Sequence, residues 1–567
     1  MKLLRALSVI CGLVLPGLAL DREAFTFTKY DLSVRVEPEQ QRLGVRGRIT
    51  LRNDSTAPQK NIALQISSTL DWRSIQIEGK TVEFVAHEYT SDIDHTGSLS
   101  EAIMTLPEAI PAKGTIELEI GYEGVIPLDG TRLTRIGVPE DKAKHTDWDQ
   151  IGKSFTAVRG IGYVAWYPVA TESANLSEGN SVAETVGRWN ARFAYAVMSV
   201  IFESTVDEPI FFTGTSSLFM GKSEPGIAKV AAFSVANPGV SVPTFVIGNY
   251  QKLAPNDLLT IQYLPGQEEG AKEYAEVAPN IDPIPPIGRG SGSLQILGLP
   301  GPDAASFVSE GMLLCPLKSP VTNEAVLDIV YAKARHLVSS PRAWIQDGLA
   351  HYAQAAFIEE QGGGQAALDY LTAHRAPLVE AEKQFKPGTA GWETAHSLIN
   401  APDDLYLQTK AMDVWWMLRV MLGNPAFAGA LLNYHASEDK DGAYLQRLIE
   451  KETHRDLQWF FDDWVYRDRG LPDFRVDSVY ARPIVNGGYI VTIAIENLGN
   501  AGAEVPVTLR MEDGEVTKRL EVHAKSKAAV RIEAPTTPLE VVVNDGSVPE
   551  SDMSNNVFKV PPPEAAK

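Results

Sequence analysis

The stretch Ser339-Ser340-Pro341-Arg342-Ala343-Trp344-Ile345-Gln346-Asp347-Gly348-Leu349-Ala350-His351-Tyr352 carries the most information about this chain of 567 residues. We expect the part of it that contains Asp347 and His351 to be helical. Asp347 and His351 stand four residues apart and would share one face of that helix. A carboxylate and an imidazole at this spacing are both groups that can bind a metal ion.

The pattern Trp-apolar-x-acid-Gly-apolar-Ala-x-Tyr, from Trp344 to Tyr352, resembles a helix of the aminopeptidase N-like family of gluzincin zinc metallopeptidases. In that family the helix carries the third zinc ligand, a Glu, where this chain has Asp347. Weaker similarities extend over about residues 25–474, among them Val242 to Tyr250 and the Phe460-Phe461-x-x-Trp464 run. The resemblance implies a thermolysin-like, mainly helical catalytic-type domain.

The family's first two zinc ligands should come from a His-Glu-x-x-His helix just upstream, in which the Glu activates the metal-bound water. No two of the ten histidines stand four residues apart. Alignment on Ser340 places Tyr331 and Arg335 at the two His positions and Ala332 at the Glu position. Tyrosine is a poor zinc ligand, alanine moves no proton, and arginine stays cationic and repels a divalent ion. The His-Glu-x-x-His motif is therefore degenerate.

If the two helices keep the family arrangement, Asp347 faces Arg335, with Lys333 nearby. A buried carboxylate needs such a partner. We therefore predict that an ion pair occupies the position that zinc has in the family. The alternative is that Arg335 points to solvent and Asp347 only caps its helix.

A residual zinc site made from His336, Asp347 and His351 is a further alternative, although nothing there supplies a general base. Two other family elements are also altered. Residues 299–311 lack the Gly-x-Met-Glu-Asn strand whose Glu binds the substrate amine. The position of the family's transition-state tyrosine holds Gln408, and Tyr406 lies nearby but out of register.

Composition excludes several classes of protein. A formal net charge of −21 argues against nucleic acid or an anionic membrane as a partner. Residues 1–20, with Lys2 and Arg5 before an apolar run, predict a cleaved signal peptide and an exported protein, periplasmic or extracellular, without a transmembrane anchor. Cys315 is then the only cysteine, and we expect it to be a buried apolar residue.

The order of patterns predicts a multidomain α+β chain. Alternating residues indicate an N-terminal β domain, a sandwich or saddle, over residues 21–250. A gluzincin peptidase-like domain over 251–473 follows, helical from about Glu324, with the glycines at 362–364 interrupting one helix. Renewed alternation predicts an immunoglobulin-like β-sandwich over 474–560, and 561–567 form a tail.

These observations favour an exported pseudopeptidase that binds a peptide or protein in a retained cleft, with no cofactor. One alternative is an active, divergent zinc metallopeptidase, and another is a structural or interaction protein of the cell envelope. A cleft lined with unpaired carboxylates favours the enzyme. A filled cleft favours the structural protein, and an open cleft with a cation at its base favours the peptide-binding protein.

Overall fold

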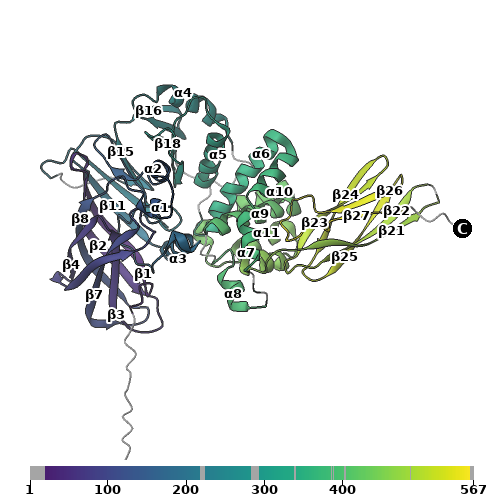
Figure 1. Ribbon diagram of the computed structural model, residues 1–567, viewed down its shortest axis with the longest axis horizontal. Helices are drawn as coiled ribbons and strands as arrows, with labels where there is room; N and C mark the ends of the chain where they lie inside the picture. Colours follow the sequence, from purple (N-terminus) through teal and green to yellow (C-terminus); the bar gives the residue numbers. More distant parts are fainter. Residues whose placement is uncertain are drawn as a thin grey trace, which may run out of the picture.

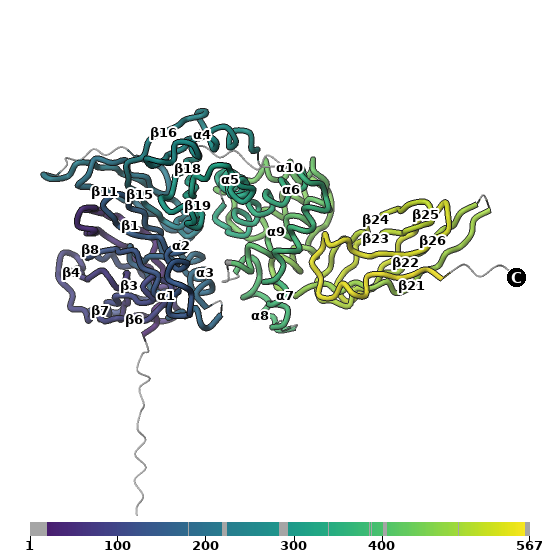
Figure 2. Tube along the Cα trace, turned by 45° about the horizontal axis from the view of Figure 1, so that its top comes forward, coloured from purple at the N-terminus to yellow at the C-terminus, as the bar shows by residue number. Residues whose placement is uncertain are grey.

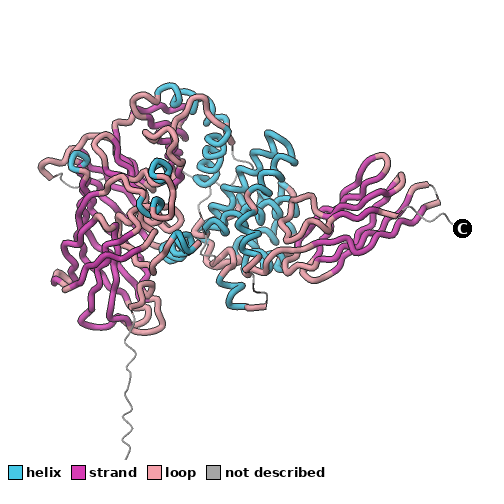
Figure 3. Tube along the Cα trace, viewed as in Figure 1, coloured by secondary structure: helices cyan, strands magenta, loops and turns pink. Residues whose placement is uncertain are grey.

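The computed structural model describes residues 20–179, 181–217, 224–282, 293–337, 340–384, 386, 388–400, 404–485 and 487–561. The predicted signal peptide and tail lie almost wholly outside the described residues. Sheets occupy both ends of an elongated molecule, and helices lie between them (Figures 1 and 3). Over the described ranges, twelve α-helices and six sheets make this a multidomain α+β chain.

The N-terminal region is built around β1 (Phe25–Glu37), whose side chains alternate between buried and exposed. This alternation places Tyr30 and Leu32 in the core, because successive side chains of a strand point to opposite faces. β1 pairs antiparallel with β2 (Arg42–Asn53) and parallel with β11 (Val197–Ser204). The remaining strands of this region are β3 (Gln59–Ser67), β4 (Leu70–Ile77), β5 (Lys80–Thr81), β6 (Phe84–Thr90), β7 (Ser98–Ile110), β8 (Thr115–Val125), β9 (Gln150–Ile151), β10 (Phe155–Val158), β12 (Ile210–Phe212), β13 (Thr215–Ser217), β14 (Lys229–Ala236) and β15 (Phe245–Gly248). They form an eight-stranded sheet in the order β13-β14-β11-β1-β2-β8-β4-β5, a three-stranded sheet β3-β7-β6 and a four-stranded sheet β12-β15-β10-β9.

Three helices interrupt this β region, where the sequence pattern predicted strands throughout. Two are short, α1 (Thr131–Thr134) and α2 (Glu140–Thr146), and the third is α3 (Ser181–Phe193). The strand-like alternation from Phe193 to Glu203 begins inside α3, because Phe193 is the last residue of that helix and β11 starts only at Val197. Val186, Trp189 and Phe193 are buried at helical spacing, which is the signal that the alternation around them concealed.

A five-stranded sheet follows in the order β16-β17-β18-β20-β19, with β19 at its edge. Its strands are β16 (Gln251–Asn256), β17 (Leu259–Tyr263), β18 (Leu294–Gly298), β19 (Phe307–Ser309) and β20 (Met312–Cys315), and α4 (Glu268–Val277) packs against it. Cys315 is buried on β20, and burial raises the pKa of its thiol to about 12. The prediction that it is a buried apolar residue is confirmed.

The helical region packs α6 against both α5 and α9. Its helices are α5 (Asn323–Leu337), α6 (Ala343–Ala373), α7 (Ala376–Glu382), α8 (Ala390–Ala395), α9 (Asp404–Leu422), α10 (Asn424–Leu432), α11 (Tyr444–Thr453) and α12 (Gln458–Phe461). Gly348 allows the close approach of α6 and α9, since a Cβ there would lie 2.5 Å from the Cβ of Ala411. The predicted interruption of α6 is present at Gly363, which has a φ of 82°. None of the described helices is long and apolar enough to cross a membrane.

The C-terminal region contains two antiparallel sheets, β21-β22-β25 and β24-β23-β26-β27 (Figure 1). Their strands are β21 (Phe474–Pro483), β22 (Tyr489–Asn497), β23 (Ala503–Met511), β24 (Gly514–Val522), β25 (Lys527–Ala534), β26 (Pro538–Val543) and β27 (Val557–Lys559). Trp464 joins this region to the helices, because its indole N–H donates to the carbonyl of Gly502 at 2.7 Å.

Replacing Glu550 with glutamine should make the protein less sensitive to alkaline pH. Burial raises the pKa of the Glu550 carboxyl from about 4.5 to about 7, and the Asn544 amide donates to it. Between these two pH values the unfolded chain loses the proton that the folded chain keeps, so stability falls as pH rises. The resulting loss in the free energy of unfolding, about 3 kcal/mol at most, is complete above pH 7. Calorimetry at pH 5 and pH 8 should show a smaller difference for Glu550→Gln than for the parent. The exposed Glu512 offers a control substitution to glutamine, and an equal pH effect in both variants would contradict this assignment.

Candidate functional site

An open cleft of about 690 Å³ lies where the N-terminal region, β19 and the helical region meet. One wall consists of α3 and the loop at 161–163. The opposite wall consists of α5, α6 and the beginning of α9. Figures 1 and 2 show α3 at the junction with the helices, and α3 contacts α9. The cleft therefore depends on the helix that sequence reasoning missed.

Two side chains of neighbouring helices form an ion pair at the base of this cleft. The guanidinium Nε of Arg335, on α5, donates to Oδ1 of Asp347, on α6, at 2.6 Å. Both side chains are largely buried, with 7% and 14% of their surface exposed. Tyr331 donates its hydroxyl to the same Asp347 oxygen at 3.2 Å. The predicted ion pair is therefore present.

The alternative arrangement is wrong. Arg335 is buried rather than pointing to solvent. Asp347 lies in the second turn of α6, whose N-cap is Arg342. Lys333 takes no part in the pair, because its ammonium donates to the carbonyl of Ile281.

Arg335 also connects the two walls of the cleft. Its Nη2 donates to the main-chain carbonyl of Val240, in the loop before β15. Its Nη1 is buried and has no hydrogen-bond partner among the described residues. Burial would lower the pKa of this guanidinium, but Asp347 more than compensates and raises it. Arg335 is therefore a permanent cation.

The residues at this position do not fit a zinc ion. Arg335 places a positive charge against the only carboxylate that faces it from α6. Burial raises the pKa of the Tyr331 hydroxyl, so it remains a neutral phenol, and Ala332 is a buried methyl group where the resemblance requires a base. A metal ion would have to displace the guanidinium from Asp347 and leave it buried without a partner.

The alternative ligands His336 and His351 lie in different surroundings. The ring of His351 packs on Tyr331, with centroids 4.7 Å apart, and its Nδ1 lies 3.1 Å from the amide oxygen of Gln354. Burial lowers the pKa of His351, which keeps it neutral. His336 lies behind the cleft beside Gly311 and does not line it. Over the described ranges, no group of three or more His, Cys, Asp or Glu side chains is arranged to hold a metal ion.

Tyr406 does not line the cleft. Its hydroxyl donates to Asp468 at 2.8 Å, and the ammonium of Lys410 contacts the same carboxylate at 3.0 Å. Gln408, which stands at the family's tyrosine position, does line the cleft. No tyrosine of α9 is thus directed at the cleft among the described residues.

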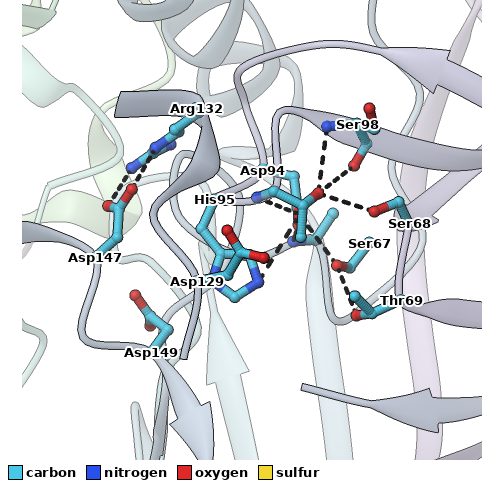
Figure 4. A network of polar contacts seen from close by, with 12 residues as sticks. Ser67, Ser68, Thr69, Asp94, His95, Ser98, Asp129, Arg132, Asp147 and Asp149 are labelled. Atoms are coloured by element: carbon cyan, nitrogen blue, oxygen red, sulfur yellow. Dashed lines mark hydrogen bonds and ion pairs between the residues drawn. The ribbon is translucent and has the colours of Figure 1, made fainter. Parts of the chain in front are cut away.

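A buried polar network supports the N-terminal wall (Figure 4). Arg132 binds Asp147 through two bonds of 2.7 and 2.8 Å, and it also donates to the carbonyl of Gly162. The backbone N–H of His95 donates to the carbonyl of Tyr163 at 2.7 Å. These bonds fix the loop that faces the helices across the cleft.

The charged groups of the opposite wall are mostly neutralised by neighbours. Arg342 binds Asp439 through its Nε and Nη2 atoms at 2.8 to 2.9 Å. Asp328, one turn before Tyr331 on α5, has no ion pair among the described residues and lines the cleft. Sequence reasoning missed it, although a charged residue within the apolar run from Ala325 to Tyr331 was the available signal.

Solved structures that are similar to this chain include zinc metallopeptidases, with TM-scores below 0.5. Neither the known protein families nor the curated proteins include a match for this chain. An M1 zinc metallopeptidase variant from Deinococcus radiodurans, bound to a Tyr-Ser-Ala substrate, is 15% identical, with a TM-score of 0.46 over 78% of this chain and 94% of that one. Yeast LTA4 hydrolase in complex with bestatin is 14% identical, with a TM-score of 0.45 over 78% and 68%. At these values the likeness assigns no role to any residue of this chain.

Proposed function

We propose that this protein is an exported pseudopeptidase that binds a peptide, or an extended protein segment, in its cleft without hydrolysing it. The observation that carries the proposal is the Arg335–Asp347 ion pair at the base of an open cleft. An open cleft with a cation at its base is the arrangement expected of a peptide-binding protein. Ala332 stands where the resemblance requires the general base, and a methyl group cannot activate water.

The size and lining of the cleft also suit a peptide. Its volume of about 690 Å³ falls within the range of ligand sites, and its walls combine apolar side chains with a few polar groups. Tyr195 adds an exposed aromatic ring at its border. Aromatic rings of this kind contribute much of the binding energy in protein interfaces.

We expect the purified protein to retain a subset of peptides from a peptic digest of casein and to leave them intact. Ultrafiltration followed by mass spectrometry would identify the retained peptides, with and without added stoichiometric zinc. Ala191 is an exposed residue of α3 that lines the cleft, so Ala191→Trp should narrow the cleft and reduce retention. Ala86→Trp, on exposed β6, should retain the same peptides as the parent.

Two results would overturn the proposal in different ways. Shortening of the peptides when zinc is added, together with zinc in the protein by elemental analysis, would establish an active metallopeptidase. Absence of retention by every form of the protein would favour a structural role in the envelope.

A further inference from the structure

Asp328 is a carboxylate at the cleft wall with no cationic partner in the described part of the chain. It lies on α5, partly buried, one turn before Tyr331. Ser306, next to the edge strand β19, lies near enough to lower the pKa of this carboxyl, though less than burial raises it. Burial raises the pKa of Asp328, and the neighbouring Glu324 raises it further. A desolvated carboxylate of this kind is stabilised by any cation that reaches it.

The remaining charges of the cleft do not serve Asp328. Apart from three tyrosines, its ionisable lining residues are Asp328, Arg335, Arg342, Asp347 and His351. Asp347 neutralises Arg335, Asp439 in the loop between α10 and α11 neutralises Arg342, and His351 is uncharged. One negative charge is therefore left in the cleft, and its position is Asp328.

Aromatic residues adjoin Ser306 and Asp328 in the sequence and line the same cleft. Phe307 follows Ser306 directly, and its ring lies 5.4 Å from that of Tyr163 on the opposite wall. Tyr331 follows Asp328 by one helical turn and also lines the cleft. The rings of Tyr163 and Phe307 already contact the guanidinium of Arg159, at 3.5 and 5.3 Å from their centroids, so Asp328 is the group of this wall that is left to attract a cation.

We propose that Asp328 binds a positively charged group of the peptide held in the cleft, an ammonium or guanidinium. This inference rests on the proposed peptide-binding function and adds the charge of the ligand. The group comes either from a Lys or Arg side chain or from a free amino terminus.

Four synthetic peptides separate these sources: acetyl-Phe-Lys-Phe-amide, Phe-Gln-Phe-amide, acetyl-Phe-Gln-Phe-amide and acetyl-Phe-Glu-Phe-amide. Isothermal titration calorimetry should show that at least one of the first two binds roughly ten-fold more tightly than the neutral third. The acidic fourth peptide should bind most weakly. Preference for the first identifies a side-chain cation, and preference for the second identifies the amino terminus.

Asp328→Asn should abolish the preference for a cation while the neutral peptide binds as before. This variant removes a desolvated charge, so its thermal stability should equal or exceed that of the parent. Glu360→Gln, an exposed substitution on α6 outside the cleft, should keep the preference. Equal affinity for all four peptides would overturn the assignment of Asp328 and leave the peptide-binding function intact. Absence of binding by all four would overturn both.

Discussion

Replacing Asp347 with alanine is expected to lower the free energy of unfolding of the helical region by about 3–5 kcal/mol. The substitution would leave the guanidinium of Arg335 buried and without its anion, while its Nη1 already has no partner among the described residues. Urea unfolding followed by tryptophan fluorescence is a suitable measurement. Trp344 lies one turn before Asp347 on α6 and stacks on Trp415, with ring centroids 5.3 Å apart.

The matched control removes both charges together. Arg335→Met combined with Asp347→Leu replaces the pair with apolar side chains of similar size, and should recover most of the lost stability. Asp347→Ala with the stability of the parent would refute the ion pair as a structural element. Equal losses in the single and double variants would indicate packing, rather than the unpaired charge, as the cause.

Replacing Arg159 with methionine should destabilise the N-terminal region by a similar amount, about 3–5 kcal/mol. Arg159 and Asp149 form an ion pair at 2.6 Å with 2% and 0% of their side chains exposed. The guanidinium also lies against the rings of Trp148, at 3.8 Å, and Tyr163, at 3.5 Å. Because Tyr163 lines the cleft, peptide retention should fall together with stability.

Two variants test the cause of that effect. Arg159→Lys keeps the charge but not the planar, forked geometry, so it should be intermediate in both measurements. Arg447→Met removes one partner of an exposed pair with Asp441, 2.9 Å apart, and should change stability little. A loss for Arg447→Met as large as that for Arg159→Met would contradict the argument from burial.

The ion pair at the base of the cleft was predictable because its two residues lie close together in the sequence. The distance along the chain between Arg335 and Asp347 places them on consecutive helices that the resemblance packs side by side, and the structure pairs them. Two buried side chains of opposite charge on adjacent helices are each stabilised by pairing with the other. Tyr331 and Ala332 followed from the same alignment.

The N-terminal wall could not be derived in this way. The side chains of α3 line the cleft opposite helices that lie more than a hundred residues later in the sequence. The helical pattern of α3 also lies between two runs of strand-like alternation. The hydrogen bond from Arg335 to the carbonyl of Val240 also joins residues that lie far apart in the sequence. Contacts of this kind depend on how separate sheets and helices meet, which the local pattern of polar and apolar residues does not encode.

Arg335 donates its hydrogen bond to the main-chain oxygen of Val240. The two positions therefore differ in how well they tolerate substitution. Any residue at position 240 presents the same carbonyl, so a substitution there keeps the hydrogen bond that links the two walls. Position 335 has no such freedom, since only a long, forked cation reaches both Asp347 and that oxygen. Of the two residues that make this link, Arg335 is therefore the less replaceable.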